Sequence, residues 1–171
     1  MRKLKLFTAL FALAALTGTA ALAAGETQHY VNARFGFSAD LPVRMEALPE
    51  PANGDGRSFE DAKSGLSISV YASYNVLMED ALQTANGHVP EGVKAASLSK
   101  AGDRAKDAAL RWEAEGSVFW LRVRLVHEAD GDDGTLISIF ARCPRKSEKK
   151  CRAEVLAALD SLKATAKPAA D

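Results

Sequence analysis

Histidine and cysteine are scarce in this sequence, which contains three histidines and two cysteines among 171 residues. None of the histidines has another histidine or a cysteine two to four residues away, the spacing that builds a metal site within one helix or strand. His127 stands at the end of an apolar strand pattern, which is typical of a histidine satisfied within the fold. The sequence therefore predicts no metal site and no cofactor. The histidines are His29, His88 and His127.

The motifs of the common enzyme classes are also missing. There is no G-x-G-x-x-G or Walker sequence for nucleotides, and no G-x-S-x-G nucleophile elbow, because Lys63-Ser64-Gly65 lacks the first glycine. We therefore expect a protein that is not an enzyme. Of the three functions considered, an enzyme of unknown class ranks last.

An excess of positive charge is absent, with 22 basic and 22 acidic residues in the whole chain. Residues 1–23 hold three of the basic residues and none of the acidic ones, so the rest carries a net charge of −3. This balance argues against a general nucleic-acid-binding protein.

Long apolar runs are limited to the N-terminus. Three positive charges among the first five residues precede the apolar run Leu6–Leu16, and small residues follow up to Ala24. This order is typical of a cleavable secretory signal peptide, which we assign to residues 1–23. No other run is long enough to cross a membrane. We expect a periplasmic or secreted protein with one globular domain over residues 24–163 and a frayed tail over 164–171.

The two cysteines, Cys143 and Cys151, both lie in the predicted mature part. In an exported protein such a pair indicates a structural disulfide. Their spacing does not match a C-x-x-C redox motif, and no histidine stands nearby for zinc. Redox or metal use is the alternative.

Alternating apolar residues predict eight strands. A helical pattern predicts a helix over Val76–Ala85 with Asn75 as N-cap, and a last helix that Ser147 caps. The last helix should bury Cys151, Val155, Leu159 and Leu162. This order predicts an α+β fold, a single meandering antiparallel sheet flanked by helices. The strands are expected at His29–Val31, Phe35–Ala39, Arg57–Asp61, Leu66–Tyr74, Val93–Lys100, Ala105–Glu115, Val118–Glu128 and Thr135–Arg142.

The segment from Tyr30 to Pro42 contains Y-x-N-x-x-x-G-F-S followed by a proline-rich loop. It resembles the opening hairpin of PsbP-like domains. With Asn53-Gly54-Asp55-Gly56 it is also similar to exported bacterial proteins of unknown role. The resemblance implies an α/β/α sandwich and an adaptor or assembly factor rather than an enzyme. Val43-Arg44-Met45 stands where the family often has a tryptophan, and no metal- or photosystem-binding residue carries over.

Two acidic turns contain possible calcium ligands. Asp130, Asp132 and Asp133 begin like a calcium loop, but Gly134 stands at its fifth position and Ala141 at its twelfth. The turn at Asn53–Gly56 has two side-chain oxygens and two glycines. Both predict hairpin turns, with weak calcium binding as the alternative.

A basic cluster marks the start of the last helix, where six basic residues between 142 and 152 face one acidic residue, Glu148. Cations there oppose the helix dipole, and an anion is favoured. The first candidate binding surface, for an acidic protein or another anionic surface, therefore consists of Arg145, Lys146, Lys149, Lys150 and Arg152. A solvated helix start is the alternative.

A second candidate surface combines tryptophan with arginine. Trp120, Arg122 and Arg124 share one face of their strand, and Arg111 approaches from its neighbour. Like charges at such positions are unfavourable unless an anion joins them. Glu113 and Glu115 could supply it, or the surface could bind a ligand or protein.

Together these patterns predict an exported, non-enzymatic binding or assembly module whose partner is an envelope protein. The alternative is a carrier of a small ligand or metal that uses the sheet face or the Asp-rich turn.

Overall fold

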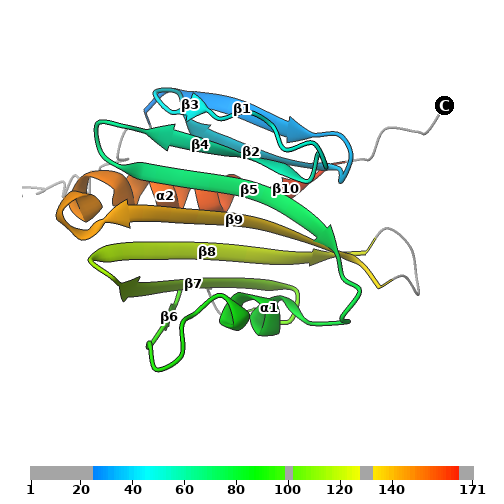
Figure 1. The fold of residues 1–171 in the computed structure, drawn as a ribbon. Helices are drawn as coiled ribbons and strands as arrows, with labels where there is room; N and C mark the ends of the chain where they lie inside the picture. Colours follow the sequence, from blue (N-terminus) through cyan, green and yellow to red (C-terminus); the bar gives the residue numbers. More distant parts are fainter. Residues whose placement is uncertain (1–24, 99–101, 128–132, 166–171) are drawn as a thin grey trace, which may run out of the picture.

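A computed structural model of the protein describes residues 25–98, 102–127 and 133–165 (Figure 1). A short 3₁₀ turn, η1 (Arg145–Ser147), precedes the last helix. The strands and α-helices are β1 (Thr27–Asn32), β2 (Phe37–Pro42), β3 (Glu46–Ala47), β4 (Gly56–Asp61), β5 (Leu66–Tyr74), α1 (Ala81–Gly87), β6 (Ala96–Ser97), β7 (Asp107–Ala114), β8 (Ser117–Val126), β9 (Thr135–Pro144), α2 (Glu148–Ser161) and β10 (Lys163–Ala164).

The strands form two antiparallel sheets. The larger has the order β3-β4-β5-β9-β8-β7-β6, and the smaller has the order β1-β2-β10. The predicted α+β class is confirmed, and the structure refines it in two respects. The strands are divided between two sheets. In the larger sheet β9 pairs with β5 along one edge and with β8 along the other, so it lies between them.

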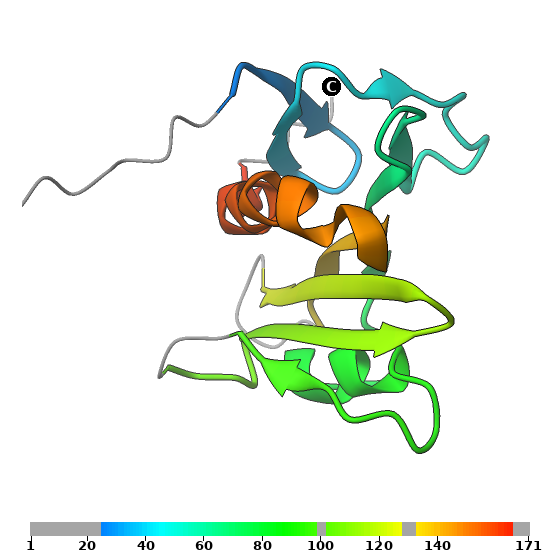
Figure 2. The same ribbon diagram turned by 90° about the vertical axis from the view of Figure 1, so that its left-hand side faces the viewer.

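The two faces of the large sheet belong to separate cores. Trp120, Ile137 and Ile139 share a core with α2 and the small sheet, whereas Leu121 and Val123 pack with α1. Since side chains alternate along a strand, β8 serves both cores at once. Figure 2 shows α2 between the small sheet above and strands β7 and β8 below. With α2 on one face of the large sheet and α1 on the other, the fold has the α/β/α arrangement implied by the resemblance.

The register of β7 on β8 follows from a two-residue turn. Glu115 and Gly116 have φ angles of 49° and 71°, which is the backbone of a type I′ hairpin turn. The predicted strands Ala105–Glu115 and Val118–Glu128 leave Gly116 and Ser117 for the turn, but Ser117 already belongs to β8. The ladder that follows places Arg111 opposite Trp120 and Asp107 opposite Arg124.

Helix α1 begins five residues later than the predicted Val76. Asp80 is its N-cap, because its side chain accepts from the Gln83 backbone at 2.7 Å while the Gln83 side chain accepts from the Asp80 backbone. This capping box satisfies two backbone donors and determines where the helix starts. Asn75 therefore does not cap it, and residues 76–78 lie in a loop.

Helix α2 buries the predicted residues Cys151, Val155 and Leu159, with Leu162 directly after it. Ser147 occupies the N-cap position but makes no side-chain hydrogen bond there, since its backbone is already helical in the 3₁₀ turn. Strand β10 then pairs with β2. Residues 166–171 of the predicted tail lie outside the described part of the chain.

Strand β6 is much shorter than the predicted Val93–Lys100, and residues 99–101 lie outside the described part. Within the described ranges, no helix is both long and apolar enough to span a membrane.

Candidate docking surface at the start of helix α2

The start of α2 is fixed to the end of the large sheet. β9 ends at Pro144, and the next backbone N–H, that of Arg145, donates to Gly116 O of the β7–β8 turn at 2.9 Å. This bond holds the 3₁₀ turn against the hairpin. Helix α2 starts from a fixed position at this end of the sheet (Figure 1).

The helical period then separates a buried stripe from an exposed one. Cys151 and Val155 are completely buried, so the opposite side of the helix faces solvent. All five residues of the first candidate surface are exposed. We call them the basic surface: Arg145, Lys146, Lys149, Lys150 and Arg152.

Two acidic residues near the basic surface are bound by Arg111 of β7. Glu148 and Glu113 each accept from Arg111 at 2.7 Å, and Arg145 lies 3.3 Å from Glu113. The hydrogen bond from Arg111 lowers the pKa of Glu113. Among the described residues, no ion pair involves Lys146, Lys149, Lys150 or Arg152. The surface therefore carries uncompensated positive charge.

The two cysteines lie beneath this surface and join α2 to β9. The Sγ atoms of Cys143 and Cys151 are 2.8 Å apart, and both residues are completely buried. As a thiol, Cys143 has its pKa raised to about 12 by burial and by its neighbour Cys151, which leaves little reactive thiolate near neutral pH. The contact brings the predicted pair together, and the covalent bond remains a prediction.

The second candidate surface is not a surface. Trp120 is 0% exposed and packs in the core under α2, and Arg111, Arg122 and Arg124 lie on that same covered face. Sequence periodicity predicted the shared face correctly, but it could not show that a distant helix covers it. Helix α2 thereby covers much of the sheet face that was considered for a small-ligand carrier.

These arginines attach α2 to the sheet instead. Arg122 donates to both carboxylate oxygens of Asp107 at 2.8 Å and to Asp160 at 2.7 Å. It also donates to the backbone oxygen of Leu159, and Arg124 donates to that of Leu162. Cations near the last carbonyls of a helix are favoured by its dipole. Arg111 binds the start of α2, and Arg122 and Arg124 bind its end.

Asp107 is the anion that allows two arginines to lie side by side. Its Oδ2 also accepts from Arg124 at 3.0 Å. Burial would raise the pKa of Asp107, but the hydrogen bonds and charges of Arg122 and Arg124 outweigh burial and lower it. Sequence reasoning assigned this role to Glu113 and Glu115. The signal that was missed is the pairing register of β7 on β8. A turn at Glu115-Gly116 places Asp107 opposite Arg124.

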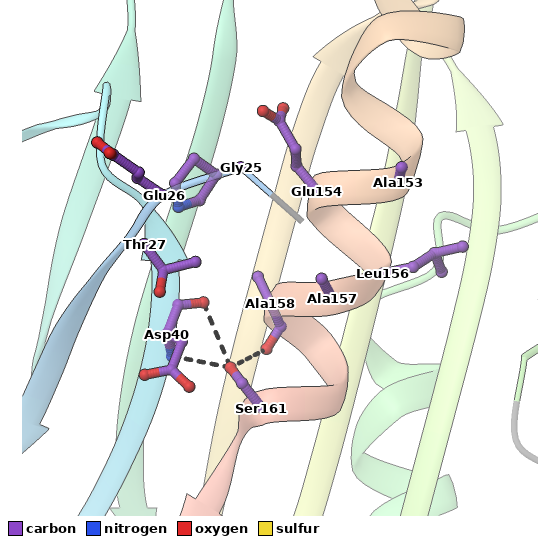
Figure 3. A pocket seen from close by; sticks show the side chains of 11 residues that line it. Gly25, Glu26, Thr27, Asp40, Ala153, Glu154, Leu156, Ala157, Ala158 and Ser161 are labelled. Carbon is purple, nitrogen blue, oxygen red and sulfur yellow. Dashed lines mark hydrogen bonds between the residues drawn. The ribbon is translucent and has the colours of Figure 1, made fainter. Parts of the chain in front are cut away.

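Two hollows flank α2. One, of about 500 Å³, lies between α2 and the β1–β2 hairpin, with Ala153 and Ala157 on the helix side (Figure 3). At its end the Asp40 backbone N–H donates to Ser161 Oγ at 2.8 Å, and Ser161 donates to Ala158 O. Ser161 is therefore already paired at this end of the hollow. The other hollow, of about 690 Å³, contains the Asp107–Arg122 pair.

The histidines and acidic turns do not converge. His29 lies 2.6 Å from Asp40, and His88 lies 3.4 Å from Tyr71, on separate elements. Burial lowers the pKa of His88. No group of three His, Cys, Asp or Glu side chains within residues 25–98, 102–127 and 133–165 is arranged to hold a metal ion. Asp55 of the first acidic turn binds Arg34 at 3.1 Å, while Asp130 and Asp132 lie outside these ranges.

Comparison with known proteins adds information on the fold. No family model matches the sequence, and no curated protein matches it. The solution structure of cyanobacterial PsbP (CyanoP) from Synechocystis sp. PCC 6803 is similar, with a TM-score of 0.53 and 13% identity over 87% of this chain and 98% of that one. The Ran-binding protein Mog1p of Saccharomyces cerevisiae has a TM-score of 0.48 and 12% identity over 82% of this chain and 96% of that one. The likeness to CyanoP shows that this chain has a PsbP-like fold.

Proposed function

We propose that the protein is an exported, non-enzymatic binding or assembly module that docks on an acidic surface of an envelope protein. The observation that carries this proposal is the basic surface, where four of five exposed cations lack an ion-pair partner among the described residues. The predicted signal peptide supports export. The fold itself is compatible with many functions and does not decide between them.

Folding does not account for the position of these charges. Cations in the first turn of a helix are opposed by its dipole, at a cost of about 0.3–1 kcal/mol each. The helix is attached without them, by its apolar stripe and by the contacts of Arg111, Arg122 and Arg124. An acidic partner would relieve both the dipole and the mutual repulsion of the cations.

The same charges would guide a partner to this end of the molecule. A concentrated patch of one sign raises the rate of association with an oppositely charged surface, and salt weakens that effect. The rest of the predicted mature chain is acidic, so a carboxylate-rich partner is attracted here and repelled elsewhere. Such a surface suits reversible docking.

Zero-length coupling of lysine amines to carboxylates tests the proposal in intact cells. We expect coupled peptides that contain Lys146, Lys149 or Lys150 joined to Asp or Glu of one envelope protein. Lys94 and Lys163 are exposed lysines outside the basic surface and serve as controls. Equal coupling at the control lysines, or no coupling at the basic surface, would contradict the proposal.

A further inference from the structure

Three consecutive large apolar side chains project from the loop between β5 and α1. Val76, Leu77 and Met78, which we call the apolar tip, are 77%, 76% and 74% exposed. Tyr74, two residues before Val76, is 55% exposed. Single exposed apolar residues are common, but a run of three at one projecting loop is unusual for a surface that faces only water.

The apolar tip is held in place by a buried asparagine. Asn75 is 4% exposed. Its side-chain oxygen accepts from the Glu79 backbone N–H at 3.0 Å, and its side-chain amide donates to the Glu79 carbonyl at 2.9 Å. Its backbone N–H donates to Gly134 O, and its carbonyl accepts from Met78 at 3.1 Å. Both ends of the loop are therefore attached to one residue.

The backbone of the tip is also strained. Met78 has a φ of 51°, in the left-handed region that non-glycine residues rarely occupy. The apolar pattern of the sequence would be satisfied by a helix over 76–85, which would bury Met78. Strain and exposure together at a rigidly held loop, with no gain in packing, are features of functional sites.

Acidic residues flank the tip in the sequence and at the residue that binds the loop. Glu79 and Asp80 follow it directly, and the exposed Asp133 stands next to Gly134, which binds the loop. The sequence has no Lys or Arg between Lys63 and Lys94. An anionic bilayer or the tip of a second copy would be repelled by these carboxylates. A pocket bordered by cations would be attracted.

We propose that the apolar tip is a second docking site, which inserts into an apolar pocket of a partner protein whose rim carries Lys and Arg. The tip lies at the opposite end of the molecule from the basic surface (Figure 1). The two ends differ in charge and in apolar character, so each selects a different partner surface. The domain thereby connects two protein surfaces, and this second contact does not depend on the first.

A photo-crosslinking residue in place of Leu77 tests the proposal in the full chain in its host cell. The expected product joins position 77 to apolar residues of one partner protein that has Lys or Arg adjacent to them. The same photo-crosslinking residue at Val43, an exposed apolar position elsewhere at 52%, should not yield this product. A crosslink to lipid or to a second copy, or no specific crosslink, would overturn the proposal.

Two further variants separate docking from folding. Met78→Gly and Val76→Ser are combined in the chain that carries the photo-crosslinking residue at position 77. Because glycine adopts the positive φ of position 78 without strain, Tm should be unchanged or higher. The yield of the crosslinked product should fall at least tenfold. An undiminished product would overturn the proposal. The pair Lys149→Glu and Lys150→Glu should leave the product unchanged, so failure of the basic surface is distinguishable from failure of the tip.

Discussion

Glu148, the first residue of α2, accepts a hydrogen bond from Arg111 of β7 at 2.7 Å. It is the only acidic residue in the stretch 142–152. Because Arg111 binds it toward the sheet, it stabilises the helix start without neutralising the lysines beside it. One contact thus attaches the helix and leaves the basic surface charged.

Replacement of Asp107 should destabilise the fold. We expect Asp107→Asn to lower the free energy of unfolding by about 2 kcal/mol at neutral pH, because Arg122 and Arg124 lose their common charged acceptor. Denaturant unfolding measures this change. As a control, Asp103→Asn alters an exposed carboxylate 3.9 Å from Lys106 and should change stability by less than about 0.5 kcal/mol.

The carboxylate of Asp107 should also contribute to the pH dependence of the free energy of unfolding. The pKa of Asp107 is lower in the folded protein, so its contribution is fully present above the unfolded value, about 3.9. It is lost as the pH falls through the folded pKa. The free energy of unfolding of the parent protein should decrease below about pH 4, and that of Asp107→Asn should decrease less. Parallel pH profiles would contradict this role.

Cys143 and Cys151 should be oxidised in the native protein. They should resist alkylation until reduction, which should remove about 2.5 kcal/mol of chain-entropy stabilisation for a nine-residue loop. For a domain of this size, Tm should fall by about 5–10 °C. Intact mass after alkylation of native and reduced samples measures the thiols. Labelling of both cysteines in freshly isolated native protein would contradict the disulfide.

Export should remove residues 1–23. The N-terminus of the isolated protein should be Ala24, and the protein should be found outside the cytoplasm. N-terminal sequencing and cell fractionation measure both. Recovery of the full-length chain from the cytosol would contradict the predicted signal peptide.

The sequence predicted the elements whose patterns are local. The stripe of Cys151, Val155 and Leu159 predicted helix α2, and strict alternation predicted β5. The predicted start of helix α1 was wrong because two local signals compete there. Asn75 and Asp80 can both cap a helix, and the capping box between Asp80 and Gln83 determines which of them does.

The candidate site shows a second limit of sequence reasoning. The exposed lysines of α2 follow from helical periodicity and the buried Cys151 alone. Trp120 and its arginines lie on one strand face as predicted, but which face a helix covers depends on contacts between residues more than 30 positions apart, such as Arg122 with Asp160. The role of Asp107 depended on a one-residue shift of the turn.

The most direct test of the account reverses two charges of the basic surface. Lys149→Glu with Lys150→Glu should abolish capture of the acidic partner identified by coupling, whereas Lys94→Glu with Lys163→Glu, which has the same net charge, should retain it. Tm of the first variant should be unchanged or higher, because Glu near a helix N-terminus stabilises by about 0.3–1 kcal/mol. Capture by the parent protein should weaken as salt rises. If the first variant captures the partner as well as the parent protein does at low and high salt, the basic surface is not the docking site.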